Sequence, residues 1–190
     1  MKNNYIIQAW LVLLLATGFG AALAGVQYGL RDRIAANKLA DTMSQIPLLV
    51  PGAKSGEPAE GFGELLVYKA LGADGQLMGW VIRKGDQGFA DIIELLIGVG
   101  PAGRDITGIY VLDQKETPGL GNKIIEESWR KQFEGKQTTP PLVVVKSAPT
   151  KEDDIEAVTG ATISSEAVIG IVNKAVAQFK ALLQKGGSSS

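Results

Sequence analysis

Residues 159–185 read TGATISSEAVIGIVNKAVAQFKALLQK, and this stretch contains the clearest structural element of the chain. Its apolar residues return at steps of three and four, which is the spacing of one face of an α-helix. Polar residues such as Asn173 and Lys174 fall on the opposite face. The spacing therefore predicts a long C-terminal helix whose buried face is formed by Val168, Ile171, Val172, Ala175, Val176, Phe179, Leu182 and Leu183.

Four runs rich in β-branched and aromatic residues precede this helix, and their partial alternation of apolar and polar positions is typical of strands. They cover residues 64–71, 76–84, 92–99 and 105–112. Between them and the helix, Asn122 to Phe133 has the composition of a short helix, and LVVVK at 142–146 is expected to be a buried strand. These elements predict one α+β domain over residues 61–185, with an antiparallel or mixed sheet.

The N-terminal end of the chain has the composition of a membrane anchor. No charged residue occurs from Tyr5 to Leu30, and AWLVLLLATGFGAALAGV at 9–26 is apolar apart from Thr17. A helix needs about 20 such residues to cross a bilayer. We expect a single transmembrane helix with a helical extension within residues 1–40. The alternative is a cleaved signal peptide, because Ala22-Leu23-Ala24 has the small-x-small form of a cleavage site.

Two further segments are expected to lie outside the regular structure. Prolines and glycines cluster between the anchor and the domain and predict a linker over residues 41–60; they are Pro47, Pro51, Gly52, Gly56 and Pro58. The final Gly-Gly-Ser-Ser-Ser at 186–190 is interpreted as an artificial tail. Charge alone does not decide the orientation of the anchor, because basic residues flank it on both sides.

Composition narrows the classes of function. At 190 residues the chain has room for one anchor and one globular domain. With 19 basic and 20 acidic residues the net charge is -1, so we expect no nucleic-acid partner. The chain contains no Cys and no His, which excludes iron-sulfur clusters, structural zinc and triads that depend on these side chains. We therefore expect no metal site, and any redox function requires an organic cofactor.

The first candidate site is Thr159-Gly160-Ala161-Thr162, directly before the C-terminal helix. The start of a helix presents unpaired backbone N–H groups and the positive end of the helix dipole, both of which favour a bound phosphate. Gly160 permits a sharp turn there. The alternative is an ordinary helix cap, because Thr and Ser are common at that position.

The second candidate site is Glu116-Thr117-Pro118-Gly119-Leu120-Gly121, at the junction of a predicted strand and a predicted helix. Its two glycines flank Leu120 and expose backbone amides, Thr117 offers a hydroxyl, and the nearby Lys123 offers a cation. The alternative is a simple strand-to-helix turn. Neither candidate site matches a P-loop or the G-x-G-x-x-G of a dinucleotide-binding fold.

Together these motifs resemble a known family. Residues 156–162 (EAVTGAT) are similar to the D-x-x-[ST]-G-A-T motif of FMN-binding domains in which a flavin transferase esterifies the final threonine. ETPGLG at 116–121, and Gly88-Phe89 followed by IIELLIGVG, resemble two further segments of these domains in the same order. The match covers most of the domain. The chain as a whole resembles the G subunit of the Rnf (Rsx) electron transport complex. The C subunit of the sodium-pumping NADH:quinone oxidoreductase is a relative of that subunit.

The resemblance implies that FMN is held covalently through a phosphoester to Thr162. The other residues that it places at the cofactor are Thr159, Gly160, Ala161, Glu116, Thr117, Gly119, Leu120, Gly121 and Lys123. Two positions depart from the family pattern: Glu156 replaces the usual Asp, and Gln114 replaces a frequent His. Candidate neighbours for the flavin ring are Trp80, Phe89, Tyr110 and Trp129.

The function implied by the resemblance is an electron relay within an ion-translocating ferredoxin:NAD oxidoreductase complex. The subunit would not be catalytic alone. Its partners would be the other subunits of the complex and a flavin transferase that matures it. The expected location is the bacterial inner membrane, with one membrane pass and the domain on the periplasmic face. The alternatives are the C subunit of a sodium-pumping NADH:quinone oxidoreductase and a non-redox, membrane-tethered assembly module.

Overall fold

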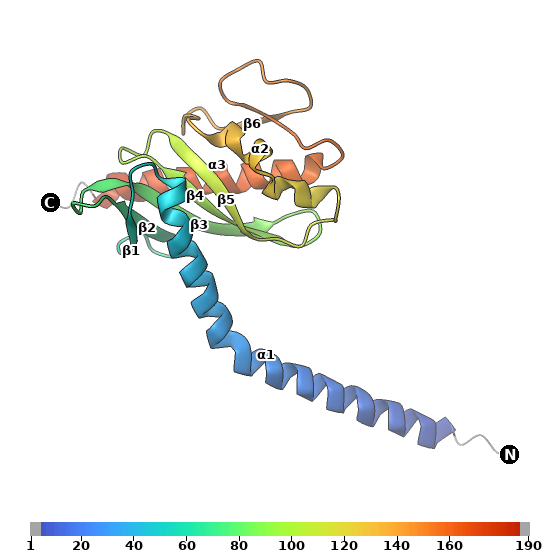
Figure 1. Ribbon diagram of the computed structural model, residues 1–190. Coiled ribbons are helices and arrows are strands. Elements are labelled where there is room, and N and C mark those ends of the chain that lie inside the picture. The colour runs from blue at the N-terminus through green and yellow to red at the C-terminus, as the bar shows by residue number, and fades with distance from the viewer. Residues whose placement is uncertain (1–4, 187–190) are drawn as a thin grey trace. The chain divides into compact units, whose positions relative to one another are not determined.

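The structure is a computed structural model that describes residues 5–186, and the chain divides into two units between Ala40 and Asp41. The first unit consists of the N-terminal part of helix α1 (Tyr5–Leu49; Figure 1). Side chains from Ala9 to Asn37 are exposed although most are apolar. By length and composition this is the one helix of the described residues that could cross a membrane. The prediction of a long apolar N-terminal helix is confirmed.

The one polar side chain in the apolar stretch of α1 is satisfied within the helix itself. The Thr17 hydroxyl donates a hydrogen bond of 2.8 Å to the Leu13 carbonyl, one turn earlier. An unpaired donor in hydrocarbon costs several kcal/mol, so this local bond makes the threonine compatible with a bilayer.

The second unit contains an antiparallel sheet of five strands, each paired with the next along the chain (Figure 1). Side chains alternate between its two faces, as the period of a strand requires: Trp80 and Ile82 face one side, and Val81 between them faces the other. Both faces are buried, which explains the nearly continuous apolar run in the fourth strand. The strands are β1 (Ser55–Ala59), β2 (Leu66–Leu71), β3 (Leu77–Gln87), β4 (Ile92–Val99) and β5 (Ile106–Asp113).

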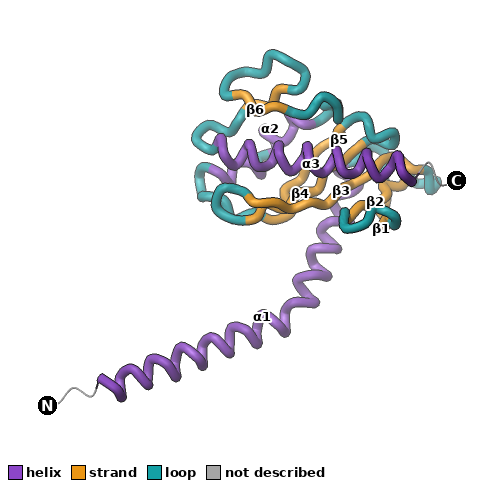
Figure 2. Tube along the Cα trace, turned by 180° about the vertical axis from the view of Figure 1, so that it is seen from behind, coloured by secondary structure: helices purple, strands orange, loops and turns teal. Residues whose placement is uncertain are grey.

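Helix α3 (Thr162–Gly186) lies across one face of this sheet, as Figure 2 shows. Phe179 is fully buried there; its ring stacks on Phe62 with 5.5 Å between centroids and lies 5.6 Å from the Trp80 ring. The predicted apolar face is buried from Val168 to Phe179, and the last two leucines are partly buried against the same cluster. The predicted C-terminal helix and the α+β fold class are both confirmed.

The other face of the sheet is covered by the last turns of α1, from Asp41 to Leu49. Ile46, Leu49 and Val50 are buried in one cluster with side chains of β2, β3 and β4. The linker predicted over residues 41–60 is therefore wrong, since this segment consists of the helix end, a turn and strand β1.

The prolines and glycines that suggested a linker have other roles. Pro58 lies in β1, the edge strand of the sheet, where a missing N–H is tolerated. Gly56 gives Ile46 the space to reach the sheet, because a Cβ at residue 56 would overlap the Ile46 Cδ1 atom. Packing against the sheet thus overrides the local preference of these residues for irregular structure.

The segment between β5 and α3 differs from its prediction in two ways. The helix expected over residues 122–133 is three short pieces, because Glu126 adopts an extended conformation that lets both Ile124 and Trp129 reach the core. The strand expected over residues 142–146 is shorter and less buried than predicted, since Val143 is 48% exposed. It pairs in parallel with a second short strand, which the sequence did not indicate. The elements are η1 (Gly121–Ile125), α2 (Glu127–Arg130), η2 (Lys131–Phe133), β6 (Val143–Val145) and β7 (Asp154–Glu156). Of the predicted tail at 186–190, residues 187–190 lie outside the described residues.

Candidate functional site

A cleft of about 410 Å³ brings the two sequence motifs together. Three segments that are distant in the sequence form its walls: the loop after β3, the turn before η1 and the first turn of α3. The volume lies within the range of small-molecule sites, about 300–1,000 Å³. The lining residues are Phe89, Thr117, Leu120, Gly121, Gly160, Ala161, Thr162, Ile163 and Ser164.

The Thr159–Thr162 motif forms the entry into α3. Gly160 has a φ of 80°, a left-handed conformation that glycine adopts without strain. The Ala161 N–H donates to the Val158 carbonyl at 2.9 Å, and Thr162 opens the helix. Backbone N–H groups of a first helical turn have no acceptor within the helix, so this end of α3 offers donors and a positive dipole at the cleft.

The side chain of Ser165 stabilises this turn. Its hydroxyl accepts the Val158 N–H at 3.0 Å and donates to the Ala161 carbonyl at 3.0 Å. Ser165 is fully buried, whereas Thr159 is exposed. A serine inside the first turn therefore holds the start of α3 in place, and Thr162 lies half-buried at the cleft.

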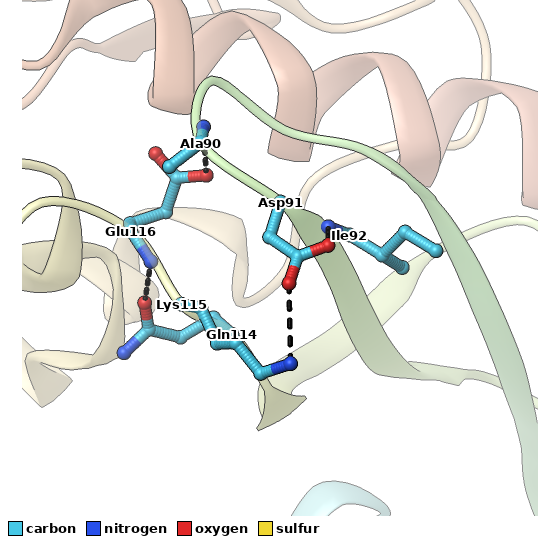
Figure 3. Close-up of polar contacts among 6 residues, drawn as sticks. All are labelled: Ala90, Asp91, Ile92, Gln114, Lys115 and Glu116. Atoms are coloured by element: carbon cyan, nitrogen blue, oxygen red, sulfur yellow. Dashed lines mark hydrogen bonds and ion pairs between the residues drawn. The ribbon is translucent and has the colours of Figure 1, made fainter. Parts of the chain in front are cut away.

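Glu116 connects the three walls of the cleft. The residue is 4% exposed; Oε1 accepts the Ala90 N–H at 3.1 Å, and Oε2 accepts the Ser164 hydroxyl at 2.6 Å. The backbone N–H of Glu116 donates to Gln114 Oε1 at 2.6 Å. Figure 3 shows the contacts with Ala90 and Gln114. The carboxylate thus has hydrogen-bond partners in the loop after β3 and in the first turn of α3.

A second, exposed contact joins the same loop to the Glu116 segment. Lys115 Nζ lies 3.2 Å from Asp91 Oδ2 (Figure 3). The Ile92 backbone N–H, and after it Lys115, hold the pKa of the Asp91 carboxyl below its usual value. Both side chains are well exposed, so water and salt screen the pair and we expect it to add little stability.

Two glycines leave the space that Glu116 occupies. A Cβ at Gly121 would lie 2.7 Å from Ser164 Oγ and 2.9 Å from Glu116 Cβ, and a Cβ at Gly88 would overlap Glu116 Oε1. Real Cβ atoms essentially never approach so closely. Glycine is required at both positions because the buried carboxylate and the backbone pack directly together.

Comparison with known proteins identifies the family of the chain. Residues 88–177 match the FMN-binding domain family. The G subunit of the ion-translocating oxidoreductase complex of Pseudomonas aeruginosa is 31% identical over 195 residues, which cover 95% of this chain and 91% of the relative. The chain belongs to this G-subunit family. The resemblance inferred from the sequence motifs is confirmed.

Another G subunit and two solved structures are also similar to this chain. The G subunit of the Na(+)-translocating ferredoxin:NAD(+) oxidoreductase complex of Acetobacterium woodii is 38% identical over 122 residues, which cover 63% of this chain and 58% of that relative. The C subunit of the Na(+)-translocating NADH-quinone reductase from Parabacteroides distasonis superposes with a TM-score of 0.57 at 22% identity, over 69% of this chain and 78% of that one. NqrC of Shewanella oneidensis has a TM-score of 0.52 at 20% identity, over 66% and 65%. These two structures share the fold.

The cleft of this G-subunit family member fits the phosphate and the ring of FMN. The first turn of α3 supplies donors for a phosphate. Phe89, Leu120 and Ile163 are exposed apolar side chains at the cleft, and such surfaces suit an aromatic ring system. Thr117 adds a hydroxyl. The residues present thus match the chemistry of the cofactor named by the domain family.

The predicted site residues fall into two groups. Six of them line the cleft: Thr117, Leu120, Gly121, Gly160, Ala161 and Thr162. The other four surround it. Thr159 and Lys123 are exposed beside the two turns, Gly119 forms the bend of its turn with a φ of 76°, and Glu116 lies behind the wall.

Of the four aromatic candidates, the structure places Phe89 at the cleft, where it is 60% exposed. Trp80 belongs to the core under α3. Trp129 is buried and donates its indole N–H to the Glu156 carbonyl at 2.8 Å. The Arg130 guanidinium lies over the Tyr110 ring, 5.5 Å from its centroid. These three rings do not line the cleft.

Sequence reasoning did not assign Ile163 and Ser164 to the site, although both line the cleft. Their position within the first turn after Thr162 was the available signal, because the start of a helix presents its first residues to a ligand bound there. The Glu116–Ser164 bond spans 48 residues of sequence, and no local pattern in a single sequence indicates such a pair.

Proposed function

We propose that this chain is the membrane-anchored electron-transfer subunit of an ion-translocating oxidoreductase complex, with FMN bound covalently to Thr162. The observation that supports the proposal most directly is the position of Thr162, which opens α3 and lines the cleft that the ETPGLG turn also lines. We propose further that the complex transfers electrons between ferredoxin and NAD, the reaction given in the name of the Acetobacterium relative.

Attachment needs an activated phosphate, because an ester does not form readily from free FMN and a hydroxyl. A flavin dinucleotide provides one. The Thr162 Oγ–P bond forms, the pyrophosphate P–O bond breaks, adenosine monophosphate leaves, and the threonine proton passes to a base of the flavin transferase or to solvent. The chain itself contributes the hydroxyl and the first-turn N–H groups that hold the phosphate.

The residues of the cleft bind and orient the cofactor. The α3 amides would hold the phosphate, Thr117 would offer a hydrogen-bonding hydroxyl, and Lys123 would add positive charge beside the turn. Leu120 and Phe89 provide apolar contact. FMN itself supplies the redox chemistry when bound, since it accepts and donates one or two electrons.

The chain acts as a relay, and its donors and acceptors are cofactors of neighbouring subunits. With no His and no Cys, the side chains left for acid-base chemistry are carboxylates, Lys and Tyr. Glu116, whose carboxylate bonds to the cleft residue Ser164, already accepts two hydrogen bonds from the protein. The proposed location is the inner membrane with the domain on the periplasmic face.

A redox titration tests the relay. The full chain, purified in detergent after flavin loading, should lose its flavin absorbance with dithionite and regain it with oxidant. NADH as sole donor should give negligible turnover, because the G-x-G-x-x-G at residues 98–103 runs from the end of β4 into the turn before the antiparallel strand β5 and does not open a helix, as a dinucleotide-binding motif must. Rapid NADH oxidation by the chain alone would identify a self-contained oxidoreductase instead.

Extraction and proteolysis test the anchor. Membranes washed with alkaline carbonate should retain the protein in the pellet, and protease added to intact spheroplasts should cleave the domain. Retention in the pellet follows from the uncharged segment of α1, which is long enough to cross a bilayer. Cleavage in spheroplasts follows from the proposed periplasmic location of the domain. A mature N-terminus near Gly25, measured by intact mass, would show that the segment is a cleaved signal peptide.

A further inference from the structure

We propose that Glu116 is a positioning residue for flavin attachment: it holds the first turn of α3, and with it Thr162, in register with the other two walls of the cleft. The family resemblance placed Glu116 among the residues that bind the cofactor. The structure instead directs both carboxylate oxygens to the protein, to Ala90 N–H and the Ser164 hydroxyl. The inference rests on the proposed function, since its consequence is the rate at which Thr162 is flavinylated.

Burial makes these two hydrogen bonds important. The carboxylate of a residue that is 4% exposed is stable only when its oxygens are paired, because water no longer solvates them. Ala90 and Ser164 lie on different segments, so separating the segments would leave the carboxylate unpaired. The structure thus ties the loop after β3 to α3 through one side chain.

The hydrogen bond between Glu116 and Ser164 affects Thr162 because both Ser164 and Thr162 belong to α3. Ser164 follows Thr162 by two residues in the same first turn of α3, so the bond to Glu116 also fixes the rotation of that turn. Close packing reinforces it, since Gly121 approaches Ser164 Oγ and Glu116 Cβ too closely for any side chain. Gly88, Glu116, Gly121 and Ser164 therefore form one unit behind the cleft.

Three variants of the full chain test the role of Glu116: Glu116→Gln, Glu116→Ala and Ser164→Ala. Each purified apoprotein is incubated with flavin transferase and a flavin dinucleotide, and the initial rate of labelling is measured by fluorescence on a denaturing gel. We expect Glu116→Gln to label about tenfold more slowly, because glutamine has one accepting oxygen in place of two, so the Ala90 N–H and the Ser164 hydroxyl can no longer donate to separate oxygens. Glu116→Ala should be slower still. Ser164→Ala removes a single hydroxyl and tests the same bond if the Glu116 variants fold poorly.

Two matched controls separate positioning from general stability. Asp154 is also 4% exposed, and its Oδ2 accepts the Thr150 and Lys151 N–H groups at 2.9 Å each, in β7 and outside the cleft lining. Asp154→Asn should lower the melting temperature and leave the labelling rate unchanged. Lys115→Gln breaks the exposed contact with Asp91 and should change neither the melting temperature nor the labelling rate.

Hydrogen exchange provides a readout that stability alone does not move. The amides of Ala90 and Ser165, which donate to Glu116 Oε1 and to the Ala161 carbonyl, should exchange faster in Glu116→Gln than in the wild type, and at the wild-type rate in Asp154→Asn. If the wild type takes no label at all, the proposed function fails. If the wild type is labelled and the Glu116 and Ser164 variants label at its rate, or slow no more than Asp154→Asn, the positioning role is overturned.

Discussion

Thr162→Ala is expected to eliminate covalent flavin completely. The proposed ester uses the Thr162 hydroxyl, and alanine has no atom that can replace it. The fold should persist, because Thr162 is half-buried in the first turn of α3, and alanine has the highest helix propensity. Flavin fluorescence on a denaturing gel and the intact mass, both measured after co-expression with a flavin transferase, check the result.

Thr159→Ala is the matched control for this prediction. It removes the other threonine hydroxyl of the same motif, which is exposed and does not line the cleft, so label should remain. A fluorescent band in Thr162→Ala would refute the assignment of the acceptor. In membranes, Thr162→Ala should also abolish ferredoxin-linked NAD reduction while the complex still assembles. Full activity of those membranes would support the assembly module instead.

Removing residues 1–60 is expected to unfold the domain, whereas removing residues 1–40 is not. A chain that begins at Gly61 lacks β1 and loses Ile46, Leu49 and Val50 from the far face of the sheet. Burial of such side chains contributes about 1.5–3 kcal/mol each. Their combined loss is comparable with the whole stability of a typical domain, about 5–15 kcal/mol. A chain that begins at Asp41 keeps all of these contacts and should fold cooperatively.

Near-ultraviolet circular dichroism and thermal melting of the two truncated chains check this expectation. A pair of point variants in the full chain provides a sharper comparison. Ile46→Asp places a charge in a fully buried position, whereas Leu48→Asp changes a neighbour that is 76% exposed. We expect only the first to lower the melting temperature strongly. A Gly61 chain with native spectra and a cooperative transition would show that the segment is a linker after all.

Local signals in the sequence were sufficient for the N-terminal helix, for α3 and for the motifs, but not for the helix expected over residues 122–133. The apolar spacing from Val168 to Phe179 predicted α3, because a helix repeats its contacts every three to four residues whatever it packs against. The uncharged stretch predicted the N-terminal helix, because the length and composition of a membrane-spanning segment belong to one continuous run of residues. The TGAT and ETPGLG motifs each depend on a few adjacent residues, so the family could be inferred from the sequence.

Only the tertiary structure decided which segments meet. Residues 41–60 have the composition of a linker, yet burial of Ile46 against the sheet and pairing of β1 with β2 make them part of the domain. Glu116 and Ser164 are 48 residues apart, and the reason for glycine at position 121 is the contact between them. The physical cause is the same in each case: helical period and turn chemistry act between neighbours in the chain, whereas burial and hydrogen bonding of a buried carboxylate act between segments that the fold brings together.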